Sequence, residues 1–258
     1  MMEDRNTQEM GETMSTWKDY LEASKYQNMP DSQQKKGITQ PPLQMAYEAD
    51  AQLISLPDPQ ECTLSESDFK NIIQKRESRR QYIVKELSQS EFSYLLWVTQ
   101  GVKEVNEAKT FTRRTVPSAG ARHPFETYLL INQVQGVAQG LYRYLALEHK
   151  LLLLEASADI NQKITEACLK QKHVQTSAVT FCWVADIART YWRYGERSFR
   201  YILLDAGHVC QNLYLAAETI QCGVCAIAAF DDDLMNTALG VDGIHLFTAY
   251  IATLGKRE

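Results

Sequence analysis

Apolar residues recur at helical spacing in several segments of the chain, and the longest such segment runs from about Glu196 to Ile220. Apolar side chains three and four positions apart predict a long buried helix there. Its expected core residues are Phe199, Ile202, Leu203, Ala206, Val209, Cys210, Leu213 and Ala217. His208 is an isolated histidine in this segment, and we expect a core position for it rather than a catalytic or metal-binding one. Asp159–Lys170 is a shorter amphipathic segment.

Two further helices have recognisable starts. Ser88 and Glu91 have the spacing of a capping box and precede an apolar run that stops near Gly101. Thr63 or Ser65 is expected to cap the other helix. That helix has its apolar residues on one face, namely Phe69, Ile72 and Ile73.

Runs of branched and aromatic residues predict strands between these helices. Residues 128–132 and 247–255 each indicate a single strand, and residues 140–155 indicate a hairpin that turns at 148–150. Ser177–Ile187 is the most strand-like run, so we expect it at the centre of a sheet. A length of 258 residues fits one domain of helices and strands with an extra segment better than two equal domains.

The amino-terminal part differs from the rest of the chain. Residues 1–16 are polar and without periodicity, so we expect a disordered tail. Residues 17–60 contain a short helical stretch, a polar loop and the extended sequence LISLPDP, and we expect an arm packed on the core. Residues 61–258 form the expected main domain.

Charge narrows the range of partners. The net charge of −5 supplies no basic face for nucleic acid, and the arginines gather around sequence motifs, which favours a small anion as ligand. No export signal and no apolar stretch long enough to span a bilayer is visible, so we expect no membrane partner.

Cysteine and aspartate patterns argue against a metal site. Six scattered cysteines indicate a reduced, cytoplasmic protein. Cys222 and Cys225 form a C-x-x-C without a second pair or a histidine spacing, and we expect core cysteines rather than zinc ligands. Asp231–Asp233 indicates the cap and acidic first turn of a helix, because three adjacent carboxylates cannot all face one ion.

The stretch at residues 113–126, RRTVPSAGARHPFE, lies between a polar segment and an apolar strand. Pro117 fixes its backbone φ angle, and Gly120 permits backbone angles closed to other residues. Three further residues have small side chains that let a flat ligand approach the main chain: Ser118, Ala119 and Ala121. Taken alone, the stretch predicts either a packed turn or the floor of a cofactor site.

A second informative stretch is Arg76–Arg80, with the sequence RESRR. If the chain is extended there, Arg76, Ser78 and Arg80 point to the same side. Two guanidinium groups and a hydroxyl suit a phosphate monoester, because charge-assisted, bidentate hydrogen bonds neutralise a dianion. Taken alone, a basic run is more often a solvated surface.

Both stretches resemble motifs of the SagB-type dehydrogenases, a branch of the FMN-dependent nitroreductase superfamily. The first resembles the signature PSAGA(R)HP(x)E, and the second resembles the R-x-S-x-R/K motif that grips the FMN phosphate. The phrases LSxxEFSxLLWxxxG and YGERxxRYxLLDAGHVxQNLYLAAE continue the resemblance. It implies an α+β, nitroreductase-like fold, in which helices wrap a mixed, mostly antiparallel sheet and one of these helices is long and central.

The resemblance also implies further cofactor contacts. Gln171 is a candidate to hydrogen-bond the polar edge of the flavin, although a polar residue that simply ends a helix explains it equally well. Ala226, Ile227 and Ala228 match the backbone that lies near the flavin N5, and ordinary strand packing predicts the same small residues. Lys256 and Arg257 are weaker candidates for the phosphate, with a charged tail as the alternative.

Arg193 and Tyr194 stand where azoline-oxidising members of the family have a catalytic Lys-Tyr pair. Tyr194 is a credible proton donor. Arginine is effectively always protonated and cannot replace lysine as a base, but Arg193 could orient a substrate carboxylate or stabilise developing negative charge. The substitution puts azoline oxidation in doubt.

The resemblance implies an FMN-dependent oxidoreductase that acts on a heterocycle in a modified peptide or on another small molecule. The alternatives are an NAD(P)H-dependent nitro or quinone reductase and a catalytically silent flavin-binding partner of a peptide-modifying complex. The family implies a homodimer with FMN at the interface. One subunit would then supply the phosphate grip, and the other would supply Pro117–Ala121.

Overall fold

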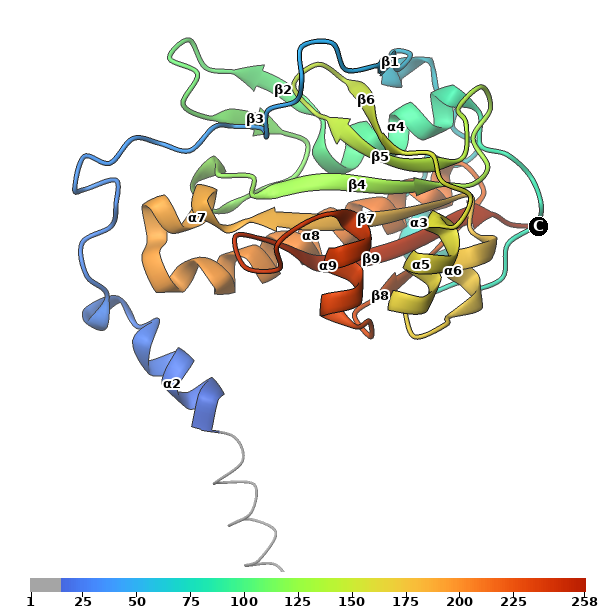
Figure 1. Cartoon of the computed structure of the whole chain (residues 1–258). Coiled ribbons are helices and arrows are strands. Elements are labelled where there is room, and N and C mark those ends of the chain that lie inside the picture. The colour runs from blue at the N-terminus through green and yellow to red at the C-terminus, as the bar shows by residue number, and fades with distance from the viewer. Residues whose placement is uncertain (1–14) are drawn as a thin grey trace, which may run out of the picture.

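A computed structural model describes residues 15–258 of the protein, and a seven-stranded sheet forms its centre (Figure 1). The strand order is β1-β6-β5-β4-β7-β9-β8, and all neighbouring strands are antiparallel. These strands are β1 Leu53–Ser55, β4 Phe125–Ile131, β5 Gly140–Leu145, β6 Lys150–Glu155, β7 Val179–Asp186, β8 Cys222–Ile227 and β9 Leu246–Lys256. A separate hairpin consists of β2 Val102–Val105 and β3 Thr112–Arg114. The predicted α+β fold is confirmed, and the strand predicted at the centre is β7, an interior strand next to the middle strand β4.

Helices pack on both faces of this sheet (Figure 1). Along β4, Leu129 and Ile131 belong to the core cluster that includes α4 and α8, whereas Tyr128 and Leu130 belong to the cluster that includes α5, α6 and α9. Alternate side chains of a strand point to opposite faces, so both faces of β4 are buried. The helices are α2 Ser15–Ala23, α3 Phe69–Lys75, α4 Gln89–Gln100, α5 Ile160–Ala167, α6 Lys172–Thr176, α7 Ile187–Tyr194, α8 Ser198–Thr219 and α9 Asp232–Leu239. Short 3₁₀ turns are η1 Tyr26–Asn28, η2 Pro59–Glu61, η3 Ala119–Ala121 and η4 Gly195–Arg197.

Helix starts were partly predictable. The capping box of α4 is confirmed, since Ser88 and Glu91 satisfy each other's backbone N–H groups. The predicted cap of α3 is wrong, because Asp68 caps this helix and the Ser65 hydroxyl donates to the carbonyl oxygen of Thr219. Of the apolar face predicted for this helix, only Ile72 is buried.

The long helix is confirmed as α8, but the prediction that its apolar residues are all buried is wrong. Phe199 and Leu203 are 42% and 47% exposed, and Leu204 is 56% exposed. His208 is also exposed, so the core position expected for it is wrong. These residues lie about one helical turn apart, and the Phe199 ring packs 6.1 Å from the Phe247 ring of β9. The amino-terminal half of α8 therefore carries an exposed stripe of Phe199, Leu203, Leu204, Gly207, His208 and Gln211.

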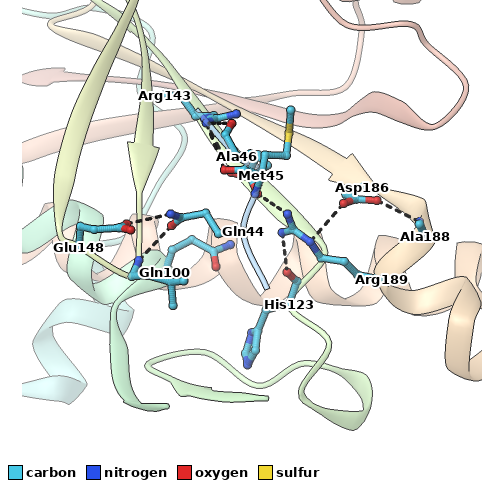
Figure 2. A network of polar contacts seen from close by, with 12 residues as sticks. Gln44, Met45, Ala46, Gln100, His123, Arg143, Glu148, Asp186, Ala188 and Arg189 are labelled. Carbon is cyan, nitrogen blue, oxygen red and sulfur yellow. Dashed lines mark hydrogen bonds and ion pairs between the residues drawn. The ribbon is translucent and has the colours of Figure 1, made fainter. Parts of the chain in front are cut away.

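The arm lies along the core and enters a buried ionic network (Figure 2). Glu126 pairs with Arg189, and one of its oxygens accepts from the backbone N–H of Met45 at 2.8 Å. Arg143 donates to the carbonyl oxygen of Ala46 at 2.9 Å. Glu126, Arg143 and Arg189 are each less than 5% exposed, so backbone groups of the arm help to satisfy charges in the interior.

The extreme amino terminus of the chain, residues 1–14, lies outside the described residues. The predicted tail therefore falls mostly outside them, and its last two residues, Ser15 and Thr16, open α2. Within residues 15–258, no helix combines the length and the apolar character needed to cross a membrane.

Candidate functional site

The Arg76–Arg80 segment is extended and runs beside the edge strand β8. The Arg79 backbone N–H donates to the carbonyl oxygen of Val224 at 2.8 Å. The Ser78 hydroxyl lies 2.9 Å from the Tyr214 hydroxyl, and the Arg76 guanidinium lies 5.4 Å from the centre of the Tyr214 ring. The intervening Arg79 forms an ion pair with Glu77. Arg76 and Ser78 therefore meet at one residue of α8, as the alternation of an extended chain requires.

A cavity of about 600 Å³ lies between this segment and the carboxyl terminus. It is lined by residues 77–83, and Arg257 contributes from the end of β9. The guanidinium of Arg257 is paired with Glu218 at 2.5 Å. Lys256 does not line the cavity, because its buried ammonium group pairs with Glu91 at 2.5 Å and donates to the carbonyl oxygen of Ile220. The structure thus gives Lys256 a place in the core and leaves Arg257 beside the Arg76–Arg80 segment.

The loop after β8 brings the other predicted cofactor residues to the same region. The Ala226 backbone N–H donates to the Tyr214 hydroxyl at 2.8 Å, and Ile227 is buried in the core. Ala228 and Ala229 are exposed, and the Gln171 side chain donates to the carbonyl oxygen of Ala229 at 2.9 Å. Gln171 therefore does touch the loop that the resemblance places at the flavin.

His173 belongs to this region and was missed by the sequence analysis. It is 7% exposed, and its Nε2 has no hydrogen-bond partner in the described part of the chain. Burial lowers the pKa of His173, and the positive charge of nearby Arg80 lowers it further. Buried polar atoms normally have hydrogen-bond partners, so the unpaired ring nitrogen of His173 near Arg80 marks a place where a partner is missing.

The second half of the site is the turn at residues 117–121, which is anchored to α8. The Ser118 hydroxyl donates to Asp205 at 2.5 Å, and the backbone N–H of His123 donates to the Ser118 oxygen at 2.9 Å. Burial raises the pKa of the Asp205 carboxyl, and the hydrogen bond from Ser118 opposes that change. Asp205 was also missed, although an acid on the apolar face of a predicted helix is a signal that a partner is needed.

Gly120 brings this turn against Arg193 and Tyr194. Its φ angle is +58°, and a Cβ atom placed on it would lie 2.4 Å from the Tyr194 hydroxyl oxygen and 3.1 Å from Nε of Arg193. The Arg193 guanidinium lies 5.7 Å from the centre of the Tyr194 ring. Gly120 is thus packed against Arg193 and Tyr194, which lie more than 70 positions away in sequence, and only glycine fits at this position.

The two halves lie on opposite faces of α8. Asp205 holds the turn at 117–121, and Tyr214 holds Arg76 and Ser78. Nine residues of α-helix correspond to two and a half turns and about 13 Å of rise, which places the two side chains on opposite sides. Among residues 15–258, no hydrogen bond or ion pair joins the turn to the Arg76–Arg80 segment.

Comparison with known proteins assigns most of this chain to one protein family. The model of the nitroreductase family matches residues 73–256. A nitroreductase candidate of Methanocaldococcus jannaschii is 32% identical over 192 residues, which cover 74% of this chain and 91% of that protein. The trifolitoxin-processing protein TfxB of Rhizobium leguminosarum bv. trifolii is 28% identical over 134 residues, which cover 50% of this chain and 36% of TfxB.

Solved structures agree with this fold. A nitroreductase candidate from Anabaena variabilis has a TM-score of 0.66 at 25% identity, over 83% of this chain and 45% of that one. The McbBCD microcin synthetase complex of Escherichia coli, solved with truncated pro-MccB17 bound, has a TM-score of 0.59 at 16% identity, over 93% of this chain and 86% of that one. A nitroreductase candidate from Desulfovibrio desulfuricans, solved with FMN, has a TM-score of 0.52 at 15% identity, over 74% of this chain and 87% of that one.

Proposed function

This chain belongs to the nitroreductase family, and we propose that it is an FMN-dependent oxidoreductase of the SagB type. The observation that carries the proposal is the meeting of Arg76 and Ser78 at Tyr214, beside the exposed loop at Ala228 and Ala229. The PSAGA sequence of the 117–121 turn and the similarity to TfxB and to the McbBCD complex support the SagB type.

The residues around the Arg76–Arg80 segment carry hydrogen-bond donors whose chemistry fits FMN. Arg76, Ser78 and Arg80 would hold the phosphate, because two guanidinium forks and a hydroxyl match a dianion. The unpaired Nε2 of His173 and the amide of Gln171 would face polar atoms of the cofactor. When bound, FMN supplies hydride transfer at N5. The neighbour from D. desulfuricans, which was solved with FMN, supports the same cofactor here.

The active form in this proposal is a homodimer. The exposed stripe of α8 provides the neighbouring apolar side chains of Phe199, Leu203 and Leu204 for a symmetric contact, and contiguous exposed apolar patches mark interaction sites. Since Asp205 and Tyr214 lie on opposite faces of α8, the turn of one subunit would complete the site formed by the Arg76–Arg80 segment of the other.

Tyr194 has the role of proton donor in the proposed reaction. Its hydroxyl lies against the backbone of Gly120, where the close packing fixes its position. Arg193 replaces the lysine of azoline-oxidising relatives and cannot serve as a base. This substitution keeps the catalytically silent partner as a second candidate, and the similarity to the M. jannaschii protein keeps an NAD(P)H-dependent nitro or quinone reductase as a third.

A visible absorption spectrum of the purified protein, followed by anaerobic addition of NADPH, separates these functions. We expect a flavin spectrum that persists with NADPH and bleaches with the oxidisable substrate, for which an azoline peptide is the first choice. Bleaching by NADPH with turnover of a nitroaromatic would favour the reductase. A protein that neither carries nor takes up FMN would contradict the proposed function.

A further inference from the structure

Two arginines flank the turn that carries Gly120. Arg122 donates through Nε to the carbonyl oxygen of Gly120 at 3.0 Å and through Nη2 to the carbonyl oxygen of Thr110 at 3.1 Å. Its guanidinium lies 5.5 Å from the centre of the Trp192 ring. Arg193 approaches the same turn from α7, with Cδ and Nε each 3.1 Å from the position of a Cβ on Gly120.

These two positive charges are not neutralised within the described chain. Neither Arg122 nor Arg193 forms an ion pair among residues 15–258, in contrast to buried Arg189, which pairs with Glu126. Glu196, the acidic residue nearest to Arg193 in sequence, accepts a hydrogen bond from Tyr191. Arg122 is only 6% exposed, and its pKa is lowered first by burial and then by the charge of Arg193.

The remaining donors of this pair are arranged for an anion. Nη1 of Arg122 has no hydrogen-bond partner in residues 15–258, and the exposed guanidinium of Arg193 has none either. Aromatic rings of Trp192 and Tyr194 back the two guanidinium groups, which limits their hydration and orients their planes. Planar forks of this kind bind carboxylates through two parallel hydrogen bonds.

We propose that Arg122 and Arg193 bind a carboxylate of the substrate and hold the rest of that molecule next to the Tyr194 hydroxyl. The inference rests on the proposed function in one respect, namely that the Gly120 turn faces the substrate. It assigns Arg193 a role as a specificity residue, where the lysine of relatives has been replaced. Phosphate groups have related chemistry, so the 2′-phosphate of NADPH is the competing source of the anion.

The test is calorimetric titration of the purified, FMN-loaded, full-length protein with benzoate and with benzamide, its uncharged counterpart. We expect benzoate to bind at least about tenfold more tightly, as one charge-assisted hydrogen bond would give. Arg193→Gln should abolish this preference, and Arg193→Lys should keep part of it. Arg122→Lys tests the buried position with less risk to folding. Arg113→Gln is the matched control, because Arg113 is exposed and paired with Glu104 in the same stretch, and it should leave the preference unchanged.

Equal binding of benzoate and benzamide, or a preference that survives Arg193→Gln, would overturn the proposal. Discrimination of NADPH from NADH that disappears in Arg193→Gln, with no benzoate preference, would assign the pair to a nucleotide phosphate and overturn the carboxylate assignment. The flavin content of each variant is measured in parallel. A protein without FMN contradicts the proposed function, whereas the comparison of benzoate with benzamide on that same protein still decides the anion site.

Discussion

Replacing Arg76 with alanine should weaken FMN binding far more than it weakens the fold. Arg76 is partly exposed and forms no ion pair in the described part of the chain, and its contact within the protein is the Tyr214 ring at 5.4 Å. Its charge is therefore available to a ligand. The loss of one charge-assisted hydrogen bond of about 1.5–3 kcal/mol corresponds to a rise of roughly 10- to 150-fold in Kd.

The assay is titration of FMN-free protein with FMN, followed by quenching of flavin fluorescence. Lys75→Ala is the matched control, because it removes a neighbouring positive charge that is exposed and paired with Glu66. It should change the Kd by less than about twofold, in line with the small contribution of exposed ion pairs. Arg76→Lys should recover part of the affinity. If Arg76→Ala binds FMN as tightly as the Lys75→Ala control, the phosphate assignment of the Arg76–Arg80 segment is wrong.

Three further predictions follow from other parts of the structure. Tyr194→Phe should leave FMN bound but slow turnover by about 10²- to 10⁴-fold, the usual contribution of a positioned proton donor, and an unchanged kcat would remove Tyr194 from the mechanism. Glu126→Gln should lower the free energy of unfolding in urea by about 3–5 kcal/mol, because Arg143 stays buried without a carboxylate partner and Arg189 keeps only Asp186. Glu104→Gln at an exposed ion pair should have little effect. Burial, with the charge of Arg114, lowers the pKa of His123 to about 3, so the unfolded state binds a proton that the folded state does not, and stability should fall as the pH drops below about 6.5. His123→Gln should flatten that slope in urea titrations between pH 4 and 7, and a slope equal to that of the unmodified protein would contradict the assignment.

Local sequence signals predicted local structure well. Ser88 and Glu91 predicted the cap of α4 because both partners of a capping box lie within one turn. The placement of Arg76 and Ser78 on one side followed from the period of an extended chain. The interior position of β7 followed from its unbroken apolar run, which is typical of a strand buried on both faces.

Contacts between distant segments were not predictable in the same way. Nothing near Ser118 indicates that its partner is Asp205, because the pairing depends on how the turn docks on α8. The apolar spacing of α8 could not distinguish Ile202, which the sheet covers, from Phe199 and Leu203, which remain exposed. Periodicity reports which residues are apolar, whereas burial depends on what the rest of the chain places over them.

The position of Asp205 and Tyr214 on one uninterrupted helix limits the changes in length that this chain can accept. A single residue inserted between them would rotate one side chain by about 100° relative to the other and shift it by about 1.5 Å along the axis. The helix is continuous from Ser198 to Thr219 and has no loop to absorb the extra residue. The exposed connection between β2 and β3 is attached to neither residue, so length changes there leave their spacing intact. We therefore expect related chains to vary in the length of that connection while keeping the acid and the tyrosine nine positions apart.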